Sequence, residues 1–200
     1  FYSNDYLGLA KNEILHQQIL NEFIAQPTLL YGSTGARLIS GNSDYLSETE
    51  ELIAKEHKVE AAIFFSSGYN ANLALFSAIL TRHDTVIVDE NIHRSVHDGI
   101  KLSNAKKLKF KHNDLDHLEK LLQRVKERCF IAVESLYSMD GDCAPLIELV
   151  ELAHKYNLPI HSHLLETKWQ RLSADHDESP LLKMDRLNLL GNKTSLAHCI

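Results

Sequence analysis

Short apolar runs alternate with segments of helical period along most of the chain, at a spacing of about 20 to 25 residues. Runs of strand length are expected at residues 61–66, 84–90, 107–110, 129–135 and 158–163. Helical period is present at residues 11–26, 44–57, 71–80, 93–103, 114–126 and 145–156, and a Gly- and Ser-rich loop at 31–42. Strands joined through helices are typical of a parallel sheet with crossover connections. The pattern therefore predicts an α/β fold with a mainly parallel sheet.

The charge balance and the apolar content exclude several classes of protein. The 200 residues carry a formal net charge of −6 and are 44% hydrophobic, as in an ordinary globular chain. An acidic chain of this kind is not expected to bind nucleic acid or an anionic membrane surface. Its apolar runs are also of strand length, which is too short to span a bilayer.

The cysteines indicate a reducing compartment. There are 3 of them and no CxxC motif occurs, so neither a disulfide framework nor a structural zinc site is expected. We therefore expect a cytoplasmic protein. The chain opens on Phe1 rather than Met, and we expect a longer parent whose start is missing.

Lysines cluster around the third expected strand. Lys106, Lys107, Lys109 and Lys111 surround the apolar Leu108. Because lysine side chains are rarely buried, we expect this segment to be an edge strand with a solvated face.

The first candidate site follows the strand expected at 61–66. Ser67, Gly68 and Tyr69 lead from that strand into a helix. Ligands of parallel α/β sheets collect at the carboxyl ends of the strands, and N–H groups at a helix N-terminus bind phosphate. A tight turn between strand and helix is the alternative interpretation, because short Gly turns are common.

Two further strand ends offer side chains to a ligand. His93 follows the second expected strand, where its ring can stack on a planar ligand or donate a hydrogen bond. A surface histidine or a helix-capping histidine is the alternative. Ser138 follows the strand at 129–135, and the Asp140–Gly141 pair beside it is also a favourable turn.

Six segments resemble one enzyme family in order and in spacing. They are SNDYLGLA (3–10), GSTGARLISGN (32–42), SSGYNAN (66–72), DENIHRS (89–95), FKHND (110–114) and ESLYSMDGDCAPL (134–146). Together they resemble the α-oxoamine synthases, which are pyridoxal 5'-phosphate enzymes of fold type I. The resemblance covers residues 1 to about 158 and implies part of the large, cofactor-binding domain of that fold.

The resemblance implies roles for particular residues. Gly68 and Tyr69 correspond to the backbone positions that hold the cofactor phosphate. His93 corresponds to the catalytic imidazole that stacks on the pyridine ring, and Ser138 to the hydroxyl near its phenolic oxygen. Asn4 corresponds to an asparagine on the substrate side of the site.

The resemblance also implies a reaction. Members of the family condense an amino acid with an acyl-CoA thioester and release carbon dioxide. The cofactor serves as the electron sink for the carbanion at Cα, and the protein positions it. Fold type I sites are commonly completed across a dimer, so the parent is expected to be a homodimer.

Two parts of such a site are missing from the sequence. The family has an Asp-x-x-His motif on the strand that here reads IHSHLLE (160–166), and its Asp contacts the pyridine nitrogen. It also has a lysine that forms an aldimine with the cofactor. Lys193 lies near the corresponding distance without the matching motif, and an exposed loop lysine is the alternative. We therefore expect the 200-residue polypeptide to be inactive, with any cofactor bound non-covalently.

The last forty or so residues resemble a second family instead, the metal-dependent amidohydrolases that cleave heterocyclic C–N or C–Cl bonds. His163 corresponds to a metal ligand, Glu166 to the carboxylate that moves a proton, and His198 to a further active-site histidine. Zinc or iron would be the metal. Even with His161 included, the ligands are fewer than the three that a catalytic site normally needs, and plain strand-end histidines are the alternative.

These observations predict a hybrid chain. Residues 1–158 would form a partial pyridoxal-phosphate-dependent transferase domain, and residues 159–200 an amidohydrolase-like piece of strand, loop, helix and strand. The junction would lie within 157–161. Three functions stay open: an acyltransferase of the first family, a metal-dependent hydrolase, and a non-catalytic protein that binds a phosphate ligand.

Overall fold

The computed structural model describes residues 5, 7–26, 32–57, 59–158, 160–163 and 194–197. The chain divides into two compact units, Phe1–Phe65 and Ser66–Ile200. The division falls directly before the helix start that the sequence singles out as a phosphate site.

Helices dominate the first unit. The helix α1 covers Glu13–Ala25 and follows a 3₁₀ turn at Leu9–Lys11. The helix α2 covers Asp44–Glu56 and follows a single π-type turn at Arg37–Gly41. The side chains of Asn12 and Ser43 cap the two helices by accepting N–H groups of their first turns, which is why both helices begin where they do.

One ion pair organises the first unit beyond its helices. The guanidinium of Arg37 donates two hydrogen bonds to the carboxylate of Glu50 on α2. The backbone N–H of Phe64 donates to the same carboxylate at 2.6 Å. The hydrogen bonds from Arg37 and from Phe64 hold the pKa of Glu50 at about 2. Glu50 is therefore a carboxylate that ties the turn, the helix and the end of the unit together.

The buried strand expected at residues 61–66 is absent, and that prediction is wrong. The stretch has no regular structure, and Ile63, Phe64 and Phe65 are exposed. A strand needs a neighbour for its backbone groups, and the described residues supply none here.

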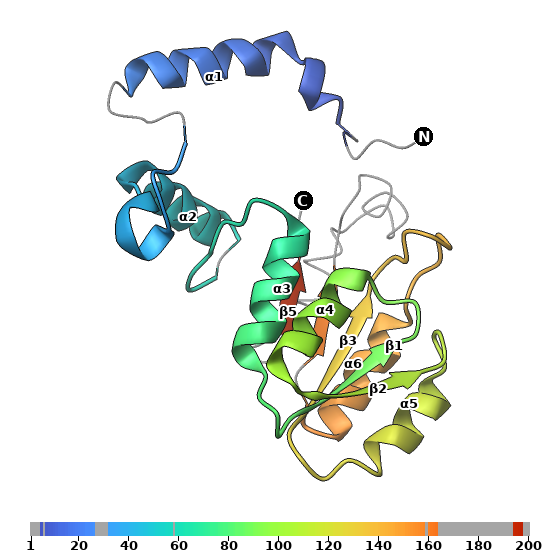
Figure 1. Ribbon diagram of the computed structural model, residues 1–200. Coiled ribbons are helices and arrows are strands. Elements are labelled where there is room, and N and C mark those ends of the chain that lie inside the picture. The colour runs from blue at the N-terminus through green and yellow to red at the C-terminus, as the bar shows by residue number, and fades with distance from the viewer. Residues whose placement is uncertain are drawn as a thin grey trace. The chain divides into compact units, whose positions relative to one another are not determined.

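The second unit contains a parallel sheet (Figure 1). Its strands are β1 Thr85–Asp89, β2 Lys106–Phe110, β3 Cys129–Glu134, β4 Ile160–His163 and β5 Thr194–Ala197. Their order is β2-β1-β3-β4-β5, and every pairing is parallel. This confirms the predicted α/β class. The lysine-rich β2 lies at an edge and exposes most of its residues, as expected.

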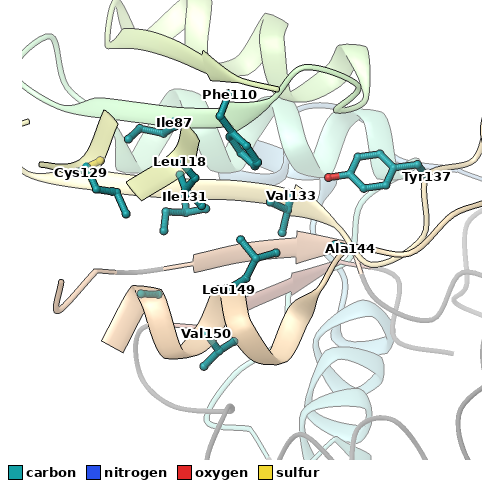
Figure 2. Close-up of a cluster of buried hydrophobic side chains, with 12 residues drawn as sticks. Ile87, Phe110, Leu118, Cys129, Ile131, Val133, Tyr137, Ala144, Leu149 and Val150 are labelled. Atoms are coloured by element: carbon teal, nitrogen blue, oxygen red, sulfur yellow. The ribbon is translucent and has the colours of Figure 1, made fainter. Parts of the chain in front are cut away.

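Helices α5 Leu115–Leu122 and α6 Leu146–Lys155 cover one face of the sheet. Ile87 and Ile131 from the strands pack there with Leu118 of α5 and Leu149 of α6 (Figure 2). Each such side chain contributes roughly 1.5–3 kcal/mol when fully buried. The hydroxyl of Tyr137 closes the end of this core and accepts the N–H of Glu134 at 3.4 Å.

Helices α3 Gly68–Ile79 and α4 Arg94–Ser103 cover the opposite face. Val86 and Val88 flank Ile87 along β1, so strand alternation turns them toward Phe76 of α3 and Val96 of α4. Burial on both faces explains why β1 reads as a continuous apolar run.

Helix boundaries differ from the sequence prediction at several places, most of all at the start of α3 and at the end of α5, which ends at Leu122 rather than at residue 126. The helix α3 begins at Gly68 rather than at residue 71, because Ser67 accepts the N–H of Asn70 and caps the helix. The expected cap of α5, Asn113, has a positive φ of 55°, and Asp114 caps the helix instead by accepting the N–H of His117 at 2.8 Å. The shifts of the two helix starts come from short polar side chains that compete for the same orphan N–H groups.

The expected strands of the C-terminal piece are present as β4 and β5, and both belong to the one sheet. The loop and helix expected between them fall on residues 164–193, outside the described part of the chain. The division between residues 158 and 159 stays a prediction. None of the helices in the described ranges has the length and apolar character needed to cross a membrane.

Candidate functional site

The start of α3 forms the first element of the candidate site. Ser67, at the N-cap, takes the N–H of Asn70. The N–H groups of Gly68 and Tyr69 open the helix, where helix geometry gives them no carbonyl partner. These groups and the positive end of the helix dipole favour an anion. The predicted phosphate site thus lies at the N-terminus of a 12-residue helix, and its role stays a prediction.

The structure brings Tyr69 and His93 together. Their ring centroids are 6.1 Å apart in an edge-on arrangement. The Tyr69 hydroxyl donates to Asp98 on α4, and Arg94 donates to the same carboxylate at 3.0 Å. The hydrogen bonds from Tyr69 and from Arg94 lower the pKa of Asp98, which stays ionised and holds the tyrosine in place.

His93 has a second role that the sequence left open. Its Nδ1 accepts the N–H of Ser95, so the residue caps α4. The ring is nevertheless exposed. The capping interpretation is thus confirmed, while stacking on a ligand stays a prediction.

Two polar side chains lie behind His93 and were not singled out by the sequence. Ser95 Oγ is 2.7 Å from His93 Nδ1, and Asn72 Nδ2 donates to Ser95 Oγ at 2.9 Å. Both residues are buried, with exposed fractions of 0% for Ser95 and 1% for Asn72. The segments HRS and SSGYNAN contain them, but only the packing of α3 on α4 shows that they meet.

The loop after β1 is held by the end of β3. Glu134 is 4% exposed, and its carboxylate accepts the backbone N–H of His93. The same loop reaches the turn that follows β3, because Asn91 Nδ2 donates to Asp140 Oδ2 at 2.9 Å. Ser138 lies exposed in that turn. Within the described ranges no hydrogen bond or ring contact joins Ser138 to Tyr69 or His93, so its predicted role stays a prediction.

A histidine between two carboxylates ties three strand ends together. His112, just after β2, has Nδ1 at 2.8 Å from Asp89 Oδ1 and Nε2 at 2.7 Å from Asp142 Oδ2. Its ring also meets the edge of Tyr137, with centroids 4.4 Å apart. Burial lowers the pKa of His112, but the hydrogen bonds to the two carboxylates outweigh it and the pKa is raised. The segment FKHND thus supplies a brace for the loop that carries Ser138.

This brace is not assigned as a metal site. His112, Asp140 and Asp142 offer ligand atoms within 4.8 Å of one another. However, both nitrogens of His112 already hold carboxylates, and the two aspartates nearest the site are largely exposed. The hydrogen bonds of His112 account for the arrangement except at Asp142 Oδ1, which is buried without a hydrogen-bond partner among the described residues.

Several predicted site residues cannot be placed. Asn4, Glu166, Lys193 and His198 lie outside the described residues. His163 lies at the end of β4, beside Glu134 of β3 in register, and nothing is described of its side chain. The amidohydrolase-like and aldimine predictions stay untested for this reason.

Several known proteins resemble this chain over most of its length. A relative from Haemophilus influenzae, provisionally named 8-amino-7-oxononanoate synthase, is 40% identical over 158 residues, which are 77% of this chain and 41% of the relative. A solved serine palmitoyltransferase variant from S. paucimobilis, with a bound PLP–myriocin aldimine, has a TM-score of 0.73 at 30% identity and covers 81% of this chain and 42% of that one. The 8-amino-7-oxononanoate synthase from Francisella tularensis has a TM-score of 0.63 at 32% identity, covering 82% and 44%.

The fold and these neighbours define the class: an α/β protein with the architecture of the fold type I enzymes. The family model described as aminotransferase class I and II matches residues 1–162, and the chain belongs to that family. The matched segment ends within β4. The chain spans 41% of the length of the Haemophilus relative.

Proposed function

We propose that this chain forms the cofactor-binding part of a pyridoxal-phosphate-dependent acyltransferase. One observation carries the proposal: the start of α3 and the exposed residue His93 meet at the carboxyl end of a parallel sheet, through the contact between the rings of Tyr69 and His93. That edge is where α/β sheets bind their ligands. The names of the relatives and of the solved neighbours point to the same chemistry.

The residues present fit the cofactor at two points. The N–H groups of Gly68 and Tyr69 would hold its phosphate, since a helix supplies no carbonyl partner to the N–H groups of its first turn and its dipole is positive there. The ring of His93, fixed by its bonds to Ser95, would contact the pyridine ring. Ser138 would reach the phenolic oxygen, as the family resemblance implies.

When bound, pyridoxal phosphate supplies an electron sink for a carbanion at Cα of an amino acid. The chain's own part is to bind and orient. Asp98 holds Tyr69 at the helix start, Glu134 holds the backbone of His93, and His112 braces the turn that carries Ser138.

For the full-length protein we propose the condensation of an amino acid with an acyl-CoA, with loss of carbon dioxide. The relatives favour 8-amino-7-oxononanoate synthase, an enzyme of biotin biosynthesis, within the α-oxoamine synthases. A homodimer in the cytoplasm is part of the same proposal. Light scattering behind size-exclusion chromatography tests the dimer, and a monomeric mass would contradict it.

For the 200-residue polypeptide we propose cofactor binding without turnover. Residues 160–193 contain no Asp-x-x-His motif, and Lys193 lacks the sequence context of the family's lysine. A hybrid origin of residues 159–200 would explain both. A continuous DNA read across the codons for residues 140–180 tests that origin. If the read continues the sequence of the pyridoxal-phosphate family without a junction, the hybrid origin is excluded.

The binding proposal is tested with pyridoxal phosphate itself. The chain is titrated while the absorbance of the cofactor is followed, then split into a dialysed sample and a borohydride-reduced sample for peptide mass mapping. We expect saturable binding at one site, release on dialysis, and no single modified lysine. Absence of saturable binding would overturn the proposed function. Stoichiometric attachment of the reduced cofactor to Lys193 would show that this lysine forms an aldimine. That result would overturn the proposal that the chain binds the cofactor without turnover.

A further inference from the structure

A chain of hydrogen bonds runs from the interior of the second unit to His93. Asn72 Nδ2 donates to Ser95 Oγ at 2.9 Å, and Ser95 Oγ is 2.7 Å from His93 Nδ1. The backbone N–H of Ser95 also points at His93 Nδ1, at 3.2 Å. Asn72 and Ser95 are buried, so water does not compete for these groups.

The chemistry of the donors decides where the protons lie. A backbone N–H can only donate, so the N–H of Ser95 favours a lone pair on His93 Nδ1, but at 3.2 Å it is farther from Nδ1 than the Ser95 hydroxyl at 2.7 Å. The amide nitrogen of Asn72 can also only donate, so Ser95 Oγ accepts from it. The single hydroxyl proton of Ser95 is then free to be given to Nδ1. A proton on Nδ1 would face the N–H of Ser95 at 3.2 Å, which is unfavourable.

We propose that Asn72 and Ser95 are positioning residues that fix His93 as the neutral imidazole with its proton on Nε2. The proposal rests on the proposed function and deepens it. A neutral ring would add no charge beside the cofactor's pyridine ring, whereas an imidazolium would repel any positive charge that the pyridine carries. The fixed Nδ1 also sets the ring plane, because two donors on one nitrogen leave little freedom to rotate.

A glycine allows the hydrogen bonds from Asn72 through Ser95 to His93, which we call the relay. A Cβ on Gly99 of α4 would lie 2.9 Å from the carbonyl oxygen of Asn72 and 2.8 Å from Cβ of Phe76. Real Cβ atoms essentially never come within 3.0 Å of such neighbours. Because residue 99 is glycine, α4 approaches α3 closely enough for Asn72 and Ser95 to form their hydrogen bond.

The direct test is the tautomer of His93 in the cofactor-free chain. Long-range proton–nitrogen NMR correlations distinguish a protonated ring nitrogen from a bare one, and His93→Gln identifies the signals of this residue. We expect a bare Nδ1 and a protonated Nε2 in the unaltered protein. A protonated Nδ1 would overturn the proposal, and this measurement needs no variant in the relay itself.

A near-isosteric change reverses the relay. In Asn72→Asp the introduced carboxylate accepts the Ser95 hydroxyl proton, and the oxygen then turns its lone pair toward His93 Nδ1. We expect the Nδ1 signal to move toward the protonated form. Ser103→Ala is the matched control, since it removes another hydroxyl of α4, one that donates to the carbonyl of Ile100, and should leave the signals unchanged. An unchanged tautomer in folded Asn72→Asp would contradict the relay.

The second variant, Ser95→Ala, keeps the backbone donor and removes the hydroxyl. We expect it to weaken pyridoxal phosphate binding about tenfold, the effect of one lost hydrogen bond. Unweakened binding would mean that the hydroxyl does not position His93. The tautomer is measured without cofactor, so it tests the relay independently of cofactor binding. If the unaltered chain binds no pyridoxal phosphate, only the proposed function is contradicted.

Discussion

His112 Nδ1 lies 2.8 Å from Oδ1 of Asp89, and this contact joins the carboxyl ends of β1 and β2. Asp89 is fully buried, and its carboxylate also accepts the N–H groups of Asn91 and Asn113. A second carboxylate, Asp142, holds the other nitrogen of the ring. Polar and charged groups, rather than apolar packing, therefore hold the carboxyl ends of β1 and β2 together.

The brace predicts a pH-dependent stability. The folded state raises the pKa of His112 above its ordinary value, so the stabilisation is complete below the unfolded pKa of about 6.5 and is lost as the pH rises through the folded pKa. We expect His112→Gln to lower the free energy of unfolding by about 1–3 kcal/mol at pH 6 and by less at pH 9. Urea unfolding measures both. His154→Gln, at an exposed position on α6, should show neither effect. An equal loss at both pH values would mean that the charge of His112 plays no part.

The start of β1 carries an ion pair with the opposite pH dependence. Arg128 donates to both oxygens of Asp84, each at 2.7 Å, and Asp84 is 4% exposed. The hydrogen bonds from Arg128 lower the pKa of Asp84 despite its burial. The stabilisation is therefore present above the unfolded pKa of about 3.9 and is lost as the pH falls through the folded pKa.

We expect Asp84→Asn to lower the free energy of unfolding by about 2 kcal/mol at pH 7. The difference from the unaltered chain should shrink in acid, which urea unfolding between pH 3 and pH 7 can follow. Glu151→Gln on the exposed side of α6 is the control for the loss of one carboxylate. A constant difference across this range would argue against a native carboxylate at Asp84.

Gly99→Ala tests the contact between α3 and α4. Alanine is the better helix former by up to about 1 kcal/mol. The clash with the backbone of Asn72 and with Phe76 costs about 1–3 kcal/mol, so we expect net destabilisation. Lys101→Ala, on the exposed face of α4, is the control for an alanine that meets no neighbour, and it should be close to neutral because lysine and alanine have similar helix propensities. A Gly99→Ala chain as stable as the Lys101→Ala chain would show that the helices have room to separate.

The sequence predicted the sheet well where residues carry a local signal. The apolar run of β1 predicted a strand, and the lysines of β2 predicted an edge strand, both in the correct places. The strand predicted at 61–66 is absent. Its apolar residues are a local signal, whereas a strand also needs a neighbouring strand, which no local pattern reveals. The helix starts at Gly68 and at Leu115 shifted because neighbouring polar residues can each act as the cap.

The candidate site was predicted in its exposed part and missed in its buried part. Tyr69 and His93 follow a helix-start signal and a strand end, and they do meet. Asn72 and Ser95 look like ordinary polar residues of helices, and their role depends on the approach of α3 to α4. His112 is 19 positions from His93, the nearest predicted site residue in the sequence, and only the parallel register of β1 and β2 places it beside Asp89.

The central claim is that the start of α3 binds the phosphate of the cofactor. The most direct measurement compares pyridoxamine 5'-phosphate with pyridoxamine by isothermal titration calorimetry, because neither compound can form a Schiff base with surface lysines. Charge-assisted hydrogen bonds from Gly68 and Tyr69 predict binding that is tighter by about tenfold or more for the phosphate. Equal affinities for the two compounds would contradict the account.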